Sequence, residues 1–179
     1  MSLGLLGGAR LDDGSLFQHV CVGGTFDGMH YGHRKLLTLA VASVDPQGGR
    51  LVVGVTTDEM LQHKELAEFI PPLKERMQCL TTFLDALAPG LKNRRKVVPI
   101  YDEMGPTATD ATIDALVLSH ETLPNGHRLN QKRIQNGLSK LKLLCTRRTE
   151  QNSMSSTALR RLKEIKTSPT TWLYRYLVY

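Results

Sequence analysis

The chain has 179 residues, of which 41% are hydrophobic and 22% charged, proportions typical of a folded globular domain and not of a disordered or fibrous chain. The formal net charge of +6 favours anionic partners, among them phosphorylated metabolites, nucleic acid and anionic membrane surfaces. The three cysteines are widely spaced with no Cys-x-x-Cys pair, which argues against zinc or disulfides and favours buried, reduced thiols.

Residues 1–17 are predicted to be a flexible extension, and residues 18–179 a single domain. The first 15 residues are glycine-rich with Arg10 as their only basic residue, whereas a signal peptide starts with cations and a transit peptide carries several arginines. No apolar stretch approaches the ~20 residues that cross a bilayer. We therefore expect a cytoplasmic protein with no membrane partner.

A strand, a glycine-rich crossing and a helix are predicted at the start of the domain. The apolar run 19–22 indicates a buried strand, and apolar side chains recur at helical spacing over residues 34–42. Between them, a glycine-rich crossing exposes backbone N–H groups at a positive helix end, which suits phosphate. His30 and His33, expected in the first helical turn, lie on one face and can reach the same anion.

Strands and helices then alternate along the chain. Further strands are predicted over residues 51–56, 96–101, 114–119 and 141–145. The predicted helices are a short one capped by Asp58 and running to Lys64, a long amphipathic one between Pro71-Pro72 and Pro89-Gly90, a polar one over 127–138, and a last one starting near 155–157. Unbroken apolar strands alternating with helices predict an α/β fold, a Rossmann-like doubly wound parallel sheet of about five strands.

Ligands of such sheets bind beyond the carboxyl ends of the strands, near the topological switch point. Four loops should converge there: the glycine-rich crossing, Thr56-Thr57, residues 102–106 and residues 119–122. The basic clusters at 92–96 and 147–148 have few aromatic neighbours on which bases could stack. We therefore expect a solvated basic edge and no nucleic-acid partner.

Two motifs near the ends of the domain carry a resemblance to a known family. Gly24-Thr25-Phe26-Asp27 with His30-Tyr31-Gly32-His33, and Ser155-Ser156-Thr157-Ala158-Leu159-Arg160, resemble the HxGH and SSTxxR motifs of the nucleotidyltransferase superfamily. Residues 53–58, 105–107, 117–122 and 130–133 are similar to phosphopantetheine adenylyltransferases of the archaeal and eukaryotic type. The resemblance implies that residues 18–179 form a nucleotidyltransferase domain. It also implies transfer of AMP from ATP to 4′-phosphopantetheine, giving dephospho-coenzyme A and pyrophosphate in coenzyme A synthesis.

The resemblance also implies site residues. Adenylyl transfer asks a protein mainly to position the reactants and to stabilise charge on the phosphoryl oxygens. We expect His33 and Lys64 to be catalytic, His33 as a donor to the α-phosphate and Lys64 as a bridge between the reacting phosphates. An exposed helix lysine without a role is the alternative for Lys64. The predicted nucleotide-binding residues are Gly24, Thr25, Phe26, His30, His33, Ser119, Glu121, Asn130, Arg133, Ser155, Ser156 and Thr157.

The acceptor is expected to contact Thr25, Asp27 and Lys64, although Asp27 can equally brace its loop by accepting backbone hydrogen bonds. Bacterial members of the family carry an Arg-Gly-Leu-Arg segment where this chain has residues 119–122 without a cation. Asn130 and Arg133 are the candidates to replace that charge.

Two arginines outside this set are interpreted separately. Arg160 faces either the triphosphate or the solvent, and Arg76 with its neighbour Glu75 is interpreted as structural.

Mg²⁺ should accompany ATP and be held mainly by its phosphates, because the sequence offers no carboxylate cluster for a dedicated metal site. The alternatives are a nicotinamide mononucleotide adenylyltransferase, a cytidylyltransferase acting on a small phosphorylated alcohol, and a non-catalytic nucleotide-binding module. The intact His30, His33 and 155–157 argue against the last. The oligomeric state is left open.

Overall fold

The computed structural model describes residues 16–146 and 155–167, so the predicted extension over 1–17 lies almost wholly outside the described residues. The strands are β1 (His19–Gly24), β2 (Arg50–Thr56), β3 (Arg95–Ile100), β4 (Ala115–Ser119) and β5 (Lys142–Thr146). The α-helices of the described residues are α1 (Tyr31–Ala42), α2 (Leu73–Leu87), α3 (Leu123–Gln135) and α4 (Ser156–Thr167). Short 3₁₀ helices are η1 (Asp27–Met29), η2 (Glu59–Leu61), η3 (Ala67–Phe69), η4 (Pro89–Arg94) and η5 (Gly105–Ala108).

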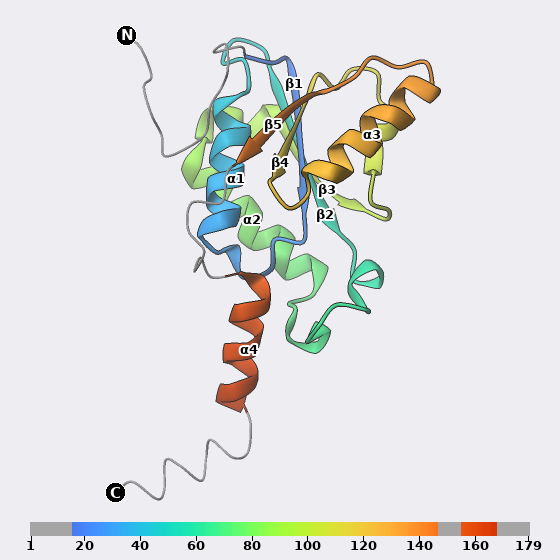
Figure 1. Cartoon of the computed structure of the whole chain (residues 1–179). Coiled ribbons are helices and arrows are strands. Elements are labelled where there is room, and N and C mark those ends of the chain that lie inside the picture. Colours follow the sequence, from blue (N-terminus) through green and yellow to red (C-terminus); the bar gives the residue numbers. More distant parts are fainter. Residues whose placement is uncertain (1–15, 147–154, 168–179) are drawn as a thin grey trace, which may run out of the picture.

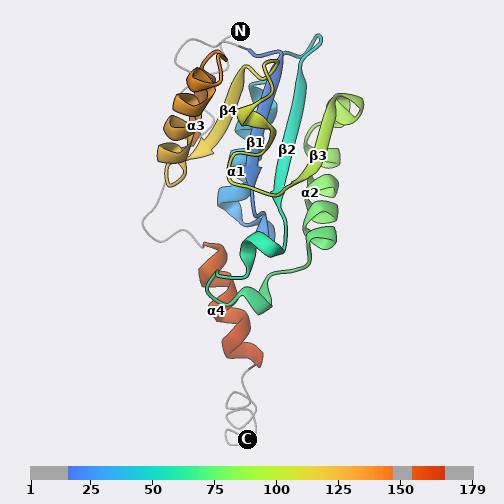
Figure 2. The same cartoon turned by 90° about the vertical axis from the view of Figure 1, so that its right-hand side faces the viewer.

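The strands form one parallel sheet in the order β3-β2-β1-β4-β5, with β1 at the centre. The chain therefore winds outward from β1 to β3 and then returns to build β4 and β5 on the other side (Figure 2). The switch point of the topology lies between β1 and β4 at their carboxyl ends. The predicted doubly wound sheet of five parallel strands is confirmed.

Helices cover both faces of the sheet because side chains alternate along its strands. Val20 and Val22 of β1 point into a core under α1 and α2, whereas Cys21 between them points into a smaller core under α3 (Figure 1). Helix α3 packs closely on β4, since a Cβ on Gly126 would lie 2.4 Å from a methyl carbon of Leu118. Because α3 contacts β4 and β5, it leaves part of this face uncovered above β1 and β2.

Two helix predictions need correction. The short helix after β2 is only the 3₁₀ turn η2, and Asp58 does not cap it. Its carboxylate instead accepts the N–H of Leu73 at 3.1 Å and so caps α2, whose first turn follows two prolines. Helix α3 begins at Leu123, not at residue 127, because Pro124 suits a first turn. It ends at Gln135 because Gly137 adopts a left-handed φ of +74°.

The prediction of free thiols is confirmed, but that of buried ones holds only in part. Cys21 is buried and Cys145 half-buried, whereas Cys79 is exposed on the outer face of α2. Burial raises the pKa of Cys21 to about 12, so its thiol stays protonated. No helix within residues 16–146 and 155–167 combines the length and the apolar character needed to span a membrane.

Candidate active site

A cavity of about 800 Å³ opens at the carboxyl ends of the central strands. The loops after β1, β2, β3 and β4 all contribute to its wall, as do the first turns of α1 and α4. The predicted convergence of four loops is confirmed. Its polar lining side chains include Thr25, His30, His33, Lys35, Thr56, Lys64, Glu65, Glu103, Ser119, Glu121, Arg128, Ser155, Ser156, Thr157 and Arg160.

The loop after β1 turns sharply so that the chain can enter α1. Phe26 has a left-handed φ of 52° and is only 1% exposed, so burial of its ring offsets the backbone strain. The ring lies over Gly24, where a Cβ would come within 3.4 Å of it. The buried Arg76 holds the strand end by donating to the carbonyl of Thr25 at 2.9 Å. Arg76 is structural as predicted, but its ionic partner is Asp58 at 2.6 Å.

His30 is the N-cap of α1, one position before the helix in which it was expected. Its Nδ1 accepts the N–H of Gly32 at 3.1 Å, so the ring proton resides on Nε2. Nε2 then donates to the hydroxyl of Ser156 at 3.2 Å, and that hydroxyl donates to the carbonyl of Asp27 at 3.0 Å. His30 therefore joins the two sequence motifs directly. Burial lowers its pKa.

His33 stacks on His30 with ring centroids 3.9 Å apart, which confirms that the two histidines share a face. Its Nδ1 is buried and has no hydrogen-bond partner among the described residues. Burial, with smaller effects from His30 and Lys64, lowers the pKa of His33 to about 3. The imidazole is therefore neutral at pH 7 and can donate one hydrogen bond. A polyanion beside it would raise this pKa, because opposite charge favours the protonated form.

Lys64 meets Thr25 at the mouth of the cavity. The Lys64 ammonium donates to the Thr25 hydroxyl at 2.9 Å, and the Thr56 hydroxyl lies 3.3 Å from the same oxygen. Because the Thr25 oxygen accepts both bonds, its own proton remains available for an anion. Desolvation lowers the pKa of Lys64, and the nearby Arg160 lowers it further. Lys64 is exposed, as the alternative of a lysine without a role expects, but it lies in a turn between η2 and η3 and not on a helix, and it bonds to Thr25.

Helix α4 brings the second motif to the same place. Its N-cap Ser155 accepts the N–H of Ala158 at 3.2 Å, while Ser155, Ser156 and Thr157 all line the cavity. The first N–H groups of a helix lack intrahelical partners and carry partial positive charge. Since the first turn of α1 lines the same cavity, two helix N-termini converge there, an arrangement that favours anion binding.

Asp27 and Arg160 form a buried ion pair behind this mouth. Nη1 of Arg160 donates to Asp27 at 2.6 Å, and the two side chains are 4% and 3% exposed. Of the two alternatives for Asp27, these contacts support the bracing one, with a guanidinium as its partner. Neither alternative for Arg160 describes its contacts, since its nitrogens bond to Asp27, the carbonyl of Glu65 and the hydroxyl of Thr157.

The structure gives Asn130 and Arg133 a structural place, contrary to the prediction that they contact nucleotide. Neither lines the cavity. The Asn130 amide exchanges two hydrogen bonds with the backbone of Leu141, and Arg133, 1% exposed, donates to the carbonyls of Ser139, Thr107 and Asp110. Ser119 and Glu121 line the cavity as expected, and Phe26 supports it from below.

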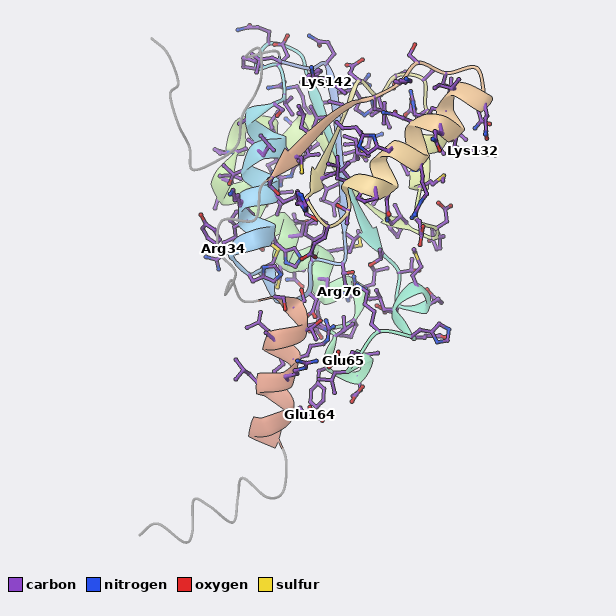
Figure 3. The ribbon with its side chains drawn as sticks, in the orientation of Figure 1. Arg34, Glu65, Arg76, Lys132, Lys142 and Glu164 are labelled. Atoms are coloured by element: carbon purple, nitrogen blue, oxygen red, sulfur yellow. The ribbon has the colours of Figure 1, made fainter. Side chains whose placement is uncertain are left out.

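Sequence reasoning missed two cations of the cavity, Lys35 and Arg128. Arg128 was missed because α3 was expected to begin at residue 127. With the true start at Leu123, Arg128 lies in the second turn, close to the loop after β4. Figure 3 labels Lys132, which lies toward the far end of α3, away from α4.

No cluster of three or more metal-ligating side chains occurs among the described residues. The carboxylates that line the cavity, Glu65, Glu103 and Glu121, come from three separate loops. This donor set suits a magnesium ion only if phosphate oxygens and water complete its coordination.

Comparisons with known proteins agree with this geometry. The chain is 36% identical over 128 residues to a phosphopantetheine adenylyltransferase of Methanopyrus kandleri, covering 72% of this chain and 77% of the relative. It is 35% identical over 165 residues to the Saccharomyces cerevisiae enzyme of that name, covering 88% of this chain but about half, 52%, of the relative. The fold matches a crystal structure of a protein with unknown function from Archaeoglobus fulgidus, with a TM-score of 0.63 at 24% identity over 76% of this chain and 94% of that one.

A family model described as cytidylyltransferase-like matches residues 21–168, a span that holds both motifs and all of the sheet but the first two residues of β1. The resemblance that those motifs carry is thereby confirmed, and the chain belongs to the cytidylyltransferase-like family.

Proposed function

We propose that this chain transfers AMP from ATP to 4′-phosphopantetheine, forming dephospho-coenzyme A and releasing pyrophosphate. One observation carries the proposal: the imidazole of His30 and the hydroxyl of Ser156, 126 positions apart, meet at 3.2 Å beside a cavity bordered by two helix N-termini. The names of the archaeal and yeast relatives support this choice of reaction.

The nucleotide's phosphates would lie between the first turns of α1 and α4. A phosphate oxygen of the acceptor attacks the α-phosphorus, and the bond to the pyrophosphate oxygen breaks. The neutral His33 donates a hydrogen bond to a non-bridging α-phosphate oxygen, where negative charge builds up. The hydroxyls of Ser156 and Thr157 and the N–H groups of α4 stabilise the leaving pyrophosphate. Bound Mg²⁺ would neutralise part of the phosphate charge.

The acceptor's phosphate would lie against Thr25 and Lys64, which already share a hydrogen bond. A second part of the cavity's lining, which we call the inner wall, is apolar, with Val52, Ile100 and Leu116 around Gly23 and Gly54. An acceptor that carries a long uncharged arm can cover this wall. A small phosphorylated alcohol cannot, so the wall favours phosphopantetheine over the cytidylyltransferase alternative.

The test is incubation of the protein with ATP, Mg²⁺ and each of several acceptors, with product identified by mass. We expect dephospho-coenzyme A and pyrophosphate from 4′-phosphopantetheine. Parallel reactions contain nicotinamide mononucleotide with ATP, and phosphorylated alcohols with CTP. Turnover of either of these in place of phosphopantetheine would overturn the proposal. A cytoplasmic location stays a prediction.

A further inference from the structure

Helix α4 carries the Ser155–Thr157 hydroxyls, yet it is joined to the rest of the molecule by a small area. Figure 1 shows α4 extending beyond the end of the sheet, and its main contacts are with η1 and η3. Leu162, on its second turn, is 47% exposed. Leu159 lies against the loop at Gly28, and the polar contacts of the first turns of α4 also hold the helix in place.

Arg160 makes two of the contacts that join α4 to the rest of the molecule, and it is the buried one of the basic residues that do so. Its Nη1 bonds to Asp27 in the loop after β1 at 2.6 Å, and its Nε bonds to the carbonyl of Glu65 at 2.9 Å. Its Nη2 reaches back to the hydroxyl of Thr157 at 3.1 Å. We call the Arg160 guanidinium, the Asp27 carboxylate and the Glu65 carbonyl the clasp.

The clasp links every segment that would surround the triphosphate. Asp27 precedes His30 by three residues, Glu65 directly follows Lys64, and Arg160 lies one turn after Ser156 and Thr157. Figure 3 shows Glu65 beside α4. A buried guanidinium is well suited to this task, because its planar fork bonds in several fixed directions at once.

The same contacts argue against direct phosphate binding by Arg160. It borders the cavity, but three of its five N–H groups, one on each nitrogen, already donate to the protein, and its charge is balanced by Asp27. We infer that Arg160 is a positioning residue: through the clasp it places the α4 hydroxyls and Lys64 around the triphosphate without itself binding phosphate. This inference rests on the proposed function, since it requires ATP at this site.

Asp27→Asn separates the two roles that Arg160 can have. If Arg160 works through the clasp, removing the charge of Asp27 loosens the clasp and weakens ATP binding, as Arg160→Gln does. If Arg160 binds phosphate, Asp27→Asn frees it and ATP binds as well as before or more tightly. The matched control is Arg161→Gln, because Arg161 neighbours Arg160 but forms an exposed pair with the Glu65 carboxylate at 2.8 Å.

Binding of MgATP is measured by calorimetry for the wild type and each variant, together with acceptor KM in the transfer reaction. We expect Asp27→Asn and Arg160→Gln each to weaken ATP binding about 100-fold, since misplacement by ~1 Å has effects of that size. The acceptor KM should rise as well, because the clasp also positions Lys64, against which the acceptor's phosphate would lie. ATP binding by Arg161→Gln should change less than about twofold. Unchanged or tighter ATP binding in Asp27→Asn would overturn the inference.

The double variant Asp27→Asn with Arg160→Gln separates positioning from mere stability. A single change leaves one buried charge without its partner and can unfold the protein, whereas the double variant leaves none. We expect its Tm to recover toward the wild-type value while ATP binding stays about 100-fold weak, because the shorter side chain at position 160 cannot bond both the new amide at position 27 and the Glu65 carbonyl. ATP binding that recovers together with Tm would contradict the clasp.

The two proposals can fail separately. If the wild type binds ATP but does not transfer AMP to 4′-phosphopantetheine, the proposed acceptor is wrong, and the binding series still tests the clasp. If the wild type binds no ATP, both proposals are wrong.

Discussion

The mouth of the cavity is lined by polar side chains, whereas its inner wall is apolar. At the mouth, side chains such as His30, Lys64 and Ser156 come from segments far apart in sequence and are held by hydrogen bonds. The inner wall consists of neighbouring strands, where Gly23 of β1 pairs with Gly54 of β2 and Ile100 stands beside them. The contacts to the reacting phosphates and the contacts to the acceptor's arm therefore lie in separate parts of the fold. A mutation can change one set of contacts without changing the other.

The largest effect is expected at the mouth, from His33→Ala. Loss of one preorganised donor to a developing charge lowers kcat by about 10²–10³. The variant should stay folded, because the ring is only partly buried and its Nδ1 makes no hydrogen bond among the described residues. Steady-state kinetics with circular dichroism check this, with His127→Ala on the exposed face of α3 as control. A kcat within a few-fold of wild type would contradict a role for His33 in the chemistry.

Arg133 lies outside both the mouth and the inner wall of the cavity, and here we expect a loss of stability without a loss of activity. Arg133→Met removes the donor for three backbone carbonyls and should lower the free energy of unfolding by about 3 kcal/mol. The KM for ATP of the folded fraction should not change. Urea unfolding measures the free energy of unfolding, and steady-state kinetics at urea concentrations below the unfolding transition measure the KM for ATP. A raised KM for ATP would show that Arg133 acts at the nucleotide site.

The inner wall is tested by Gly23→Val. A Cβ on Gly23 would meet only Gly54 and Ile100 within 4 Å, both at 3.9 Å, so the Cβ causes no clash, and because Gly23 lines the cavity the rest of the valine side chain would take up cavity space. We expect the KM for phosphopantetheine to rise about tenfold while the KM for ATP is unchanged. Equal changes in both constants would show that the two halves are not independent.

A further prediction concerns the pH dependence of stability. The unfolded chain protonates His33 near its ordinary pKa of 6.5, whereas the folded protein does so only near 3. Between these values the unfolded state binds more protons, so this contribution to stability is full above pH 6.5 and is lost as pH falls toward 3. Urea unfolding from pH 7 to 4 should therefore show a shallower loss of stability in His33→Gln than in the wild type. Equal slopes would contradict the burial of a neutral His33.

Patterns local in sequence predicted the fold well, and contacts distant in sequence limited the prediction of the site. Unbroken apolar strands gave the parallel sheet, and the spacing of His30 and His33 placed both rings on one face. The bond from His30 to Ser156 and the partner of Arg160 join positions more than 120 residues apart, which no periodicity reveals. Arg133 was predicted to contact nucleotide because a cation on a helix near the site looks the same in sequence whether it faces a ligand or backbone carbonyls.

The central claim is that the two motifs enclose one triphosphate, and a crystal structure with a non-hydrolysable ATP analogue and Mg²⁺ tests it most directly. The account predicts triphosphate density between the first turns of α1 and α4, within hydrogen-bond distance of His33 and the Ser156–Thr157 hydroxyls, with Arg160 still bonded to Asp27. A nucleotide bound elsewhere, or α4 turned away from the phosphates, would contradict it.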